Sequence, residues 1–208
     1  MRDTVTKSFS SMFKSLSSGH RMVTIPIEEG LSLRSLEQVD AKELFALTDS
    51  CRAYLREWLP WLDATRSLQD TRTFIESALH QAAANLGFQC GIWLGGQLMG
   101  VIGYHHVDWP NRSTNIGYWL GKQHQGRGLM TKACRALVDY AFDVWHLNRV
   151  EIRCAVGNVK SRAIPERLGF RSEGTLREAE WLYDHFVDHV VYGMVAKEWG
   201  ERRRMAKG

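Results

Sequence analysis

The sequence has few prolines and few cysteines, four of each in 208 residues. The cysteines (Cys51, Cys90, Cys134 and Cys154) are scattered and form no Cys-x-x-Cys pair. Such spacing is typical of reduced thiols, so we expect a cytoplasmic protein. The histidine pairs His105-His106 and His185/His189 do not match a metal-ligand pattern such as His-Glu-x-x-His, and we expect no metal.

Long hydrophobic runs are absent as well. No apolar stretch approaches the roughly 18 residues that a membrane-spanning helix requires, so we expect no membrane partner. Residues 1–22 lack the apolar core of about seven residues found in a secretory signal. We interpret them as a disordered extension, with an upstream translation start or a transit peptide as alternatives. The composition, 44% hydrophobic and 24% charged, is that of one globular domain, and the net charge of +4 permits acidic partners without requiring them.

A strand, a glycine-rich turn and a helix follow one another over Ile116–Val144. Ile116–Leu120 is apolar and rich in strand formers, and apolar residues recur at helical spacing after Gly128. Gly126 and Gly128 allow a sharp turn in front of unpaired N–H groups at the helix start. These features together predict an anion site that suits a diphosphate.

Three kinds of diphosphate loop compete for this turn. The stretch contains neither the Gly-x-x-x-x-Gly-Lys-Ser/Thr of a P-loop nor the Gly-x-Gly-x-x-Gly of a dinucleotide site. It does contain Gln123-x-x-Gly126-x-Gly128. This run resembles the acyl-CoA pyrophosphate loop, Gln/Arg-x-x-Gly-x-Gly/Ala, of the GCN5-related N-acetyltransferase (GNAT) superfamily. A plain strand–helix turn is the structural alternative.

A second motif lies downstream in register with the first. Asn158-x-x-Ser161 and Glu166-x-Leu-Gly169-Phe are similar to the corresponding segment of that superfamily, a short helix closed by glycine. The resemblance covers about residues 23–199. Ile-Gly-Tyr-Trp-Leu, Gly-x-Gly-Leu-Met and the pair before Trp181, Ala-Glu, look most like the RimJ/RimL branch, which acetylates the N-termini of ribosomal proteins.

The resemblance implies an α/β fold with one domain over residues 23–199. The expected sheet is mixed, mostly antiparallel and seven-stranded, flanked by helices and splayed between the strands at Ile116 and Val150. Helices are predicted over about 41–53 and 68–85, and a loop is predicted around Glu178, Glu180 and Trp181. Residues 200–208 are predicted to form a basic, solvated C-terminal tail.

The same resemblance supplies a co-substrate, acetyl-CoA, and the residues that bind it. Backbone N–H groups near Trp119 and Leu120 would stabilise an oxyanion, and Asn158 would hold the pantetheine arm unless it is only a turn residue. Ser161 belongs to the same set. The diphosphate would lie on the loop formed by Gln123, Gln125, Gly126, Arg127, Gly128, Leu129 and Met130.

Two catalytic roles follow from the RimL-like pattern. Ser161 would donate a proton to the departing thiolate, its alternative role being a helix cap. Glu180, nineteen residues further on, would act as the general base through water. Glu173 and Glu178 are chemically equivalent neighbours, so the assignment stays open at this point. Two tyrosines, Tyr183 and Tyr192, are weaker candidates for the proton donor.

The identity of the acceptor is the least determined feature. Trp58 and Trp61 flank Pro60 and are predicted either to line the acceptor site or to pack as a clasp on the core. The leading hypothesis is transfer of acetyl to an α-amino group, such as the N-terminus of a ribosomal protein. A small-amine or toxin-detoxifying enzyme is an alternative, with four tryptophans (Trp58, Trp61, Trp109 and Trp181) stacking the acceptor. A non-catalytic CoA-binding or ribosome-associated module is another, and a homodimer is compatible with all three.

Overall fold

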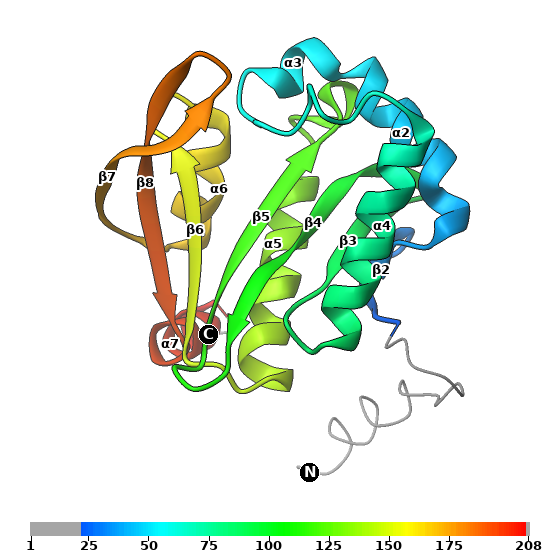
Figure 1. Cartoon of the computed structure of the whole chain (residues 1–208). Coiled ribbons are helices and arrows are strands. Elements are labelled where there is room, and N and C mark those ends of the chain that lie inside the picture. Colours follow the sequence, from blue (N-terminus) through cyan, green and yellow to red (C-terminus); the bar gives the residue numbers. More distant parts are fainter. Residues whose placement is uncertain (1–21, 207–208) are drawn as a thin grey trace.

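The computed structural model describes residues 22–206, and its centre is one eight-stranded mixed sheet (Figure 1). The strands lie in the order β1-β2-β3-β4-β5-β6-β8-β7. Their bounds are β1 (Thr24–Glu28), β2 (Leu31–Ser35), β3 (Gln89–Leu94), β4 (Gln97–Asp108), β5 (Ser113–Leu120), β6 (Arg149–Ala155), β7 (Arg171–Leu182) and β8 (His185–Val195). Only β5 and β6 pair in parallel, so the expected mixed, mostly antiparallel sheet is confirmed.

The expected number of seven strands is too low by one. The additional strand is β1, which pairs antiparallel with β2 at the edge of the sheet. It is short, no residue in it is fully buried, and it contains Pro26. A proline is tolerated in an edge strand because its missing N–H faces away from the neighbour. The same proline weakens the strand signal in the sequence, which explains the omission.

Helices cover both faces of the sheet. They are α2 (Ala41–Ser50), α3 (Arg52–Arg56), α4 (Leu68–Ala83), α5 (Leu129–Asp139), α6 (Val159–Leu168) and α7 (Ala196–Met205), with a π-helical turn at Tyr140–Val144. Leu44 of α2 and Ile75 of α4 pack with Val101 of β4 in one apolar cluster. Leu137 of α5 and Leu168 of α6 belong to a second cluster. The predicted single helix over 41–53 is instead two helices that break at Cys51.

The sheet opens between β5 and β6, as expected. These strands pair only over Ser113–Asn115 and Arg149–Glu151, although β5 continues to Leu120 and β6 to Ala155. Figure 1 shows the two strands diverging toward the top of the view. We call this gap the splay. The remaining backbone groups on the facing edges of β5 and β6 have no strand partner there, which leaves room for a ligand with amide groups.

Two segments of the second half differ from expectation. The region around Glu178 and Glu180 is part of β7 and pairs with β8 as far as Leu182, with a bulge between Leu176 and Glu180. Its charged sequence favours a loop, but the pairing with β8 keeps it extended. The basic tail predicted over 200–208 is helical to Met205 as part of α7. The extension predicted over 1–22 lies, except for Met22, outside the described residues.

Some classes of site are absent from the described part of the chain. Over residues 22–206 no helix is long and apolar enough to cross a membrane. The same residues contain no cluster of three His, Cys, Asp or Glu side chains that could hold a metal ion. The four cysteines are free and buried.

Candidate active site

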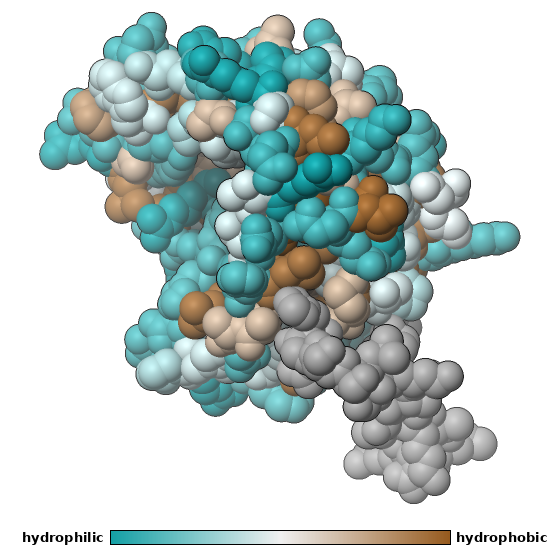
Figure 2. All heavy atoms as spheres, turned by 45° about the vertical axis from the view of Figure 1, so that its right-hand side comes forward, coloured by the Kyte–Doolittle hydropathy of each residue, from teal (hydrophilic) through white to brown (hydrophobic). Residues whose placement is uncertain are grey.

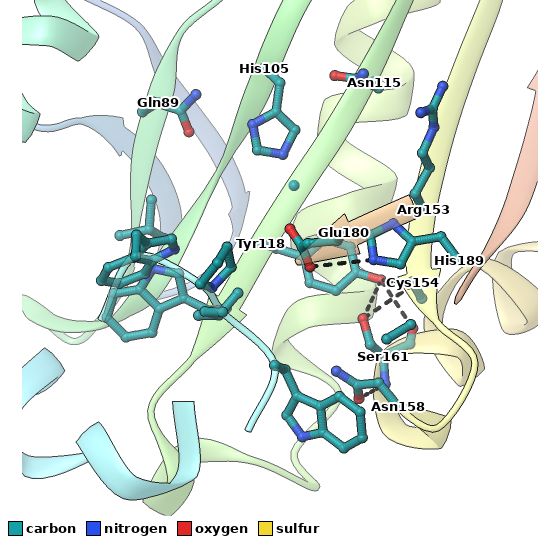
Figure 3. Close-up of a pocket in the computed structure, with 18 of the residues that line it drawn as sticks. Gln89, His105, Asn115, Tyr118, Arg153, Cys154, Asn158, Ser161, Glu180 and His189 are labelled. Carbon is teal, nitrogen blue, oxygen red and sulfur yellow. Dashed lines mark hydrogen bonds and ion pairs between the residues drawn. The ribbon is translucent and has the colours of Figure 1, made fainter. Parts of the chain in front are cut away.

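A cleft of about 710 Å³ lies over the splay, between the Trp58–Trp61 segment with α4 on one side and β7 with β8 on the other. Figure 2 shows a mostly hydrophilic surface on its face of the molecule, hollowed between the left-hand lobe and the body. Figure 3 shows that the labelled side chains of the cleft come from β3, β4, β5, β6, β7, β8 and α6. Segments far apart in the sequence therefore meet here.

The carboxylate of Glu180 lies in the cleft and contacts an imidazole. Its Oε2 is 3.4 Å from Nε2 of His189, and the two side chains are 30% and 15% exposed. The neighbours Glu173 and Glu178 line no part of the cleft. Glu173 forms a salt bridge with Arg149, which lowers the pKa of its carboxyl. Of the three glutamates that the sequence left equivalent, only Glu180 can act on a group bound in the cleft.

Ser161 lies at the first turn of α6, where Asn158 is the N-cap residue. Asn158 Oδ1 accepts the hydrogen bond from the Ser161 backbone N–H at 3.1 Å. The alternative role of Ser161 as the cap is therefore wrong, and its hydroxyl makes other contacts. Ser161 Oγ is 3.3 Å from Cys154 Sγ and donates to Tyr118 Oη at 3.4 Å. Asn158 and Ser161 both line the cleft.

Tyr118 is a site residue that sequence reasoning missed, although it lies within the Ile-Gly-Tyr-Trp-Leu run. Its hydroxyl donates to the Ser161 backbone oxygen at 3.0 Å. Burial raises the pKa of the Tyr118 phenol well above its ordinary value and also raises the pKa of the Cys154 thiol. Both groups are therefore protonated at neutral pH. The two tyrosines considered from sequence, Tyr183 and Tyr192, do not line the cleft and donate instead to Leu59 O and Glu166.

The glycine-rich turn has the backbone expected of an anion site. Gly126 and Gly128 have φ of +76° and +73°, which L side chains rarely adopt. Gly128 is the N-cap of α5, and no side chain caps that helix. A Cβ at either glycine would have no protein atom within 4 Å, so the space in front of the N–H groups is open. The arrangement fits a diphosphate.

The other predicted loop residues surround this turn with different roles. Leu129 and Met130 are buried in the core, so only their backbone N–H groups face outward at the helix start. Arg127 is exposed, and it supplies a positive charge. Gln125 Oε1 accepts from Lys160 Nζ of α6 at 3.2 Å, and this bond joins the two sides of the splay. Gln123 Oε1 is 3.4 Å from Cys51 Sγ.

The backbone N–H groups of Trp119 and Leu120 point in opposite directions. Gly121 N–H donates to Met99 O on the β4 side, and Trp119 pairs with Val101 of β4. Because N–H groups alternate sides along a strand, that of Leu120 faces the splay. Of the two expected oxyanion donors, Leu120 is thus the one whose N–H is directed to the gap. Trp119 lines the cleft with its side chain.

The tryptophans do not gather in one place. Trp58 lies against Gly157, where an added Cβ would come within 3.3 Å of its ring, and Trp61 lies 6.3 Å from Trp119 between ring centroids. Both line the cleft. Trp109 packs on Trp145, and Trp181 packs on Phe186, outside the cleft. The four-tryptophan acceptor site considered from sequence is therefore wrong.

His105, which the sequence analysis considered only as a metal ligand, is a second residue of the cleft that sequence reasoning missed. Its imidazole occupies the space over Gly117, where a Cβ would collide with the ring. Although His105 keeps an exposed surface, partial burial against the cleft lowers the pKa of its ring, while the charge of Glu180 acts in the opposite direction. Only the tertiary structure brings β4 and β7 together here.

Comparisons with known proteins agree with this geometry. A family model described as an acetyltransferase (GNAT) domain matches residues 31–171. The chain is 39% identical over 183 residues to a putative ribosomal N-acetyltransferase, YdaF, of Bacillus subtilis, covering 87% of this chain and all of that protein. The chain belongs to the GNAT family. A ribosomal-protein-serine acetyltransferase of Escherichia coli is 32% identical over 174 residues, covering 83% of this chain and 96% of the relative.

Among solved structures, a RimL ribosomal-protein α-N-acetyltransferase in complex with coenzyme A superposes with a TM-score of 0.81 at 26% identity. The match covers 83% of this chain and 98% of that one. This GNAT chain is therefore an N-acetyltransferase that uses acetyl-CoA. The open backbone turn at Gly126 and Gly128 fits the diphosphate of that co-substrate, and the splay fits its amide-containing arm.

Proposed function

We propose that this GNAT enzyme transfers acetyl to an α-amino group at a peptide N-terminus, with a ribosomal protein as the natural acceptor. The observation that carries the proposal is the cleft position of Glu180. Among the described residues that line the cleft, it is the one carboxylate. The names of the relatives YdaF and RimL, and that of the serine acetyltransferase, support a ribosomal acceptor.

The strength of the available base favours an α-amine over lysine. With a pKa of about 7.7–8, roughly a tenth of an α-amine is neutral at pH 7, whereas a lysine amine of pKa about 10.4 is neutral in fewer than about one molecule in a thousand. A carboxylate acting through water suffices to remove the proton that the α-amine loses on attack. Lysine would need a stronger base than Glu180.

The reaction needs no covalent intermediate on the protein. As the amine nitrogen bonds to the thioester carbonyl carbon, Glu180 takes the amine proton through water, and the carbon–sulfur bond then breaks. Leu120 N–H stabilises the oxyanion that forms between these events. Ser161 Oγ supplies a proton to the departing thiolate and takes up a replacement from water, while Tyr118 and Cys154 hold its hydroxyl in place. Positioning of the two reactants accounts for much of the acceleration.

The co-substrate is assigned to both sides of the splay. The N–H groups at the start of α5, with Gly126 and Gly128, bind the diphosphate, and Arg127 adds charge. Asn158 Oδ1 is used in capping α6, so its Nδ2 is the group left to hold the pantetheine arm. Trp58 closes the acceptor end of the cleft against Gly157. Trp61 also lines the cleft and lies beside Trp119 in the same wall.

The proposal is tested by following thiol release from acetyl-CoA with a panel of amines. One arm holds short synthetic peptides with a free N-terminal serine, alanine or methionine. A second arm holds the same peptides with a blocked N-terminus and one lysine, and a third holds small aromatic and nucleoside amines. We expect turnover in the first arm, with mass spectrometry placing the acetyl group on the α-nitrogen.

The other outcomes contradict the proposal in different ways. Preferential acetylation of lysine would contradict the assignment of an α-amine acceptor. Turnover confined to the small amines would favour a detoxifying enzyme. Binding of acetyl-CoA without thiol release in the presence of any amine would favour a non-catalytic CoA-binding module. The Glu180→Gln variant serves as the matched control in each arm, because it keeps the shape of the cleft and removes the base.

A further inference from the structure

Glu180 is surrounded by side chains from three other strands. His189 contacts it from β8, His105 faces it from β4 across the cleft, and Arg153 lies on the β6 side (Figure 3). Arg153 is engaged elsewhere, because its Nε donates to Glu151 at 2.6 Å. Of these three groups, His189 forms the ion-pair contact with the Glu180 carboxylate.

We propose that His189 is a positioning residue that orients Glu180 for proton transfer. The inference rests on the proposed role of Glu180 as the base. Nε2 of His189 lies 3.4 Å from Oε2, and in the proposed role its N–H holds this carboxylate oxygen and leaves Oε1 for the proton transfer. His189 is well placed for this task because it is only 15% exposed and its strand lies inside the sheet between β6 and β7. A long, partly exposed glutamate would otherwise sample several rotamers.

The proposed role requires a donor, not merely a side chain of the right size. His189→Gln keeps an N–H donor at about the reach of Nε2, whereas His189→Leu keeps the volume and loses the donor. We expect His189→Leu to lower kcat about tenfold with the KM for acetyl-CoA unchanged, because misplacing a catalytic group by about 1 Å costs up to a hundredfold. His189→Gln should recover most of the rate. His185→Leu is the matched control, since His185 contacts Asp184 instead.

A double-mutant cycle tests whether His189 acts through Glu180. Starting from Glu180→Gln, the further change His189→Leu should lower kcat by less than twofold, because the carboxylate that His189 orients is gone. The peptide with a free N-terminal serine is the probe. A full tenfold loss in the Glu180→Gln background, or a His189→Leu variant with wild-type kcat, would overturn the inference. If His189→Leu does not fold, the cycle is run with His189→Asn, whose shorter side chain withdraws the donor from Glu180, and with His189→Gln as its control.

A measurement without an acceptor separates this inference from the proposed function. Proton NMR of the imidazole rings should show that Glu180→Gln moves the His189 resonance, assigned by its loss in His189→Gln, and leaves that of His185 in place. An unmoved His189 resonance would mean that the contact does not exist. A moved resonance together with no peptide acetylation would leave the contact standing and place the failure in the choice of acceptor.

Discussion

Replacing Gly128 by valine should weaken acetyl-CoA binding while the enzyme stays folded. Gly128 has φ of +73°, and a β-branched residue in this region costs about 1–2 kcal/mol. For a protein of this size we expect the melting temperature to fall by about 2–8 °C. A Cβ there meets no protein atom within 4 Å, so its branches enter only the space assigned to the diphosphate. We expect the Kd for acetyl-CoA to rise at least about tenfold, or 1.4 kcal/mol.

The control for this experiment is Gly96→Val. Gly96 has φ of +82°, also has no atom within 4 Å of a built Cβ, and lies in the hairpin turn between β3 and β4, outside the glycine-rich turn assigned to the diphosphate. Both variants should lose similar stability in thermal unfolding, but calorimetry should show a weaker affinity only for Gly128→Val. A folded Gly128→Val variant that binds acetyl-CoA as tightly as Gly96→Val would refute the anion-site assignment.

Three further outcomes can be checked with the same assays. Glu180→Gln should lower turnover and flatten the acidic limb of the pH–rate profile without changing the affinity for acetyl-CoA, and an unchanged acidic limb would place the base elsewhere. Ser161→Ala should lower turnover less, because water can replace the proton donor. Glu173→Gln should leave turnover unchanged but lower the melting temperature, because it breaks the salt bridge with Arg149. Because the bridge lowers the pKa of Glu173, the bridge stabilises the fold above the ordinary carboxylate pKa, and this stabilisation is lost as the pH falls through the lowered pKa. A lower melting temperature of Glu173→Gln that persists in acid would contradict this account. Trp58→Ala should raise the acceptor KM at nearly constant melting temperature. An unfolded variant would instead make Trp58 a core residue, and an unchanged KM would mean that Trp58 does not contact the acceptor.

The local motifs were sufficient to predict much of the protein. Gly126 and Gly128 define a backbone conformation that few residues other than glycine adopt, and the strand before them and the helix after them have clear periodicity. The family, the left-handed turn at Gly126 and Gly128 and the helix start at Asn158 could therefore be predicted from short stretches of sequence. These features depend on residues within one turn of each other, so their physical signal is present in the chain itself.

The tertiary structure decided what depends on residues far apart in the sequence. The edge strand β1 and the pairing of β7 up to Leu182 rest on bonds to neighbouring strands, which override weak or contrary local propensity. The choice of Glu180 over Glu173 follows from the bulge in β7 and from the distant partner Arg149. Tyr118 reaches Ser161 because β5 and β6 separate and α6 lies beside the gap. His189 reaches Glu180 through the register in which β8 pairs with β7. No local pattern specifies such contacts, since each depends on strand register across the whole sheet.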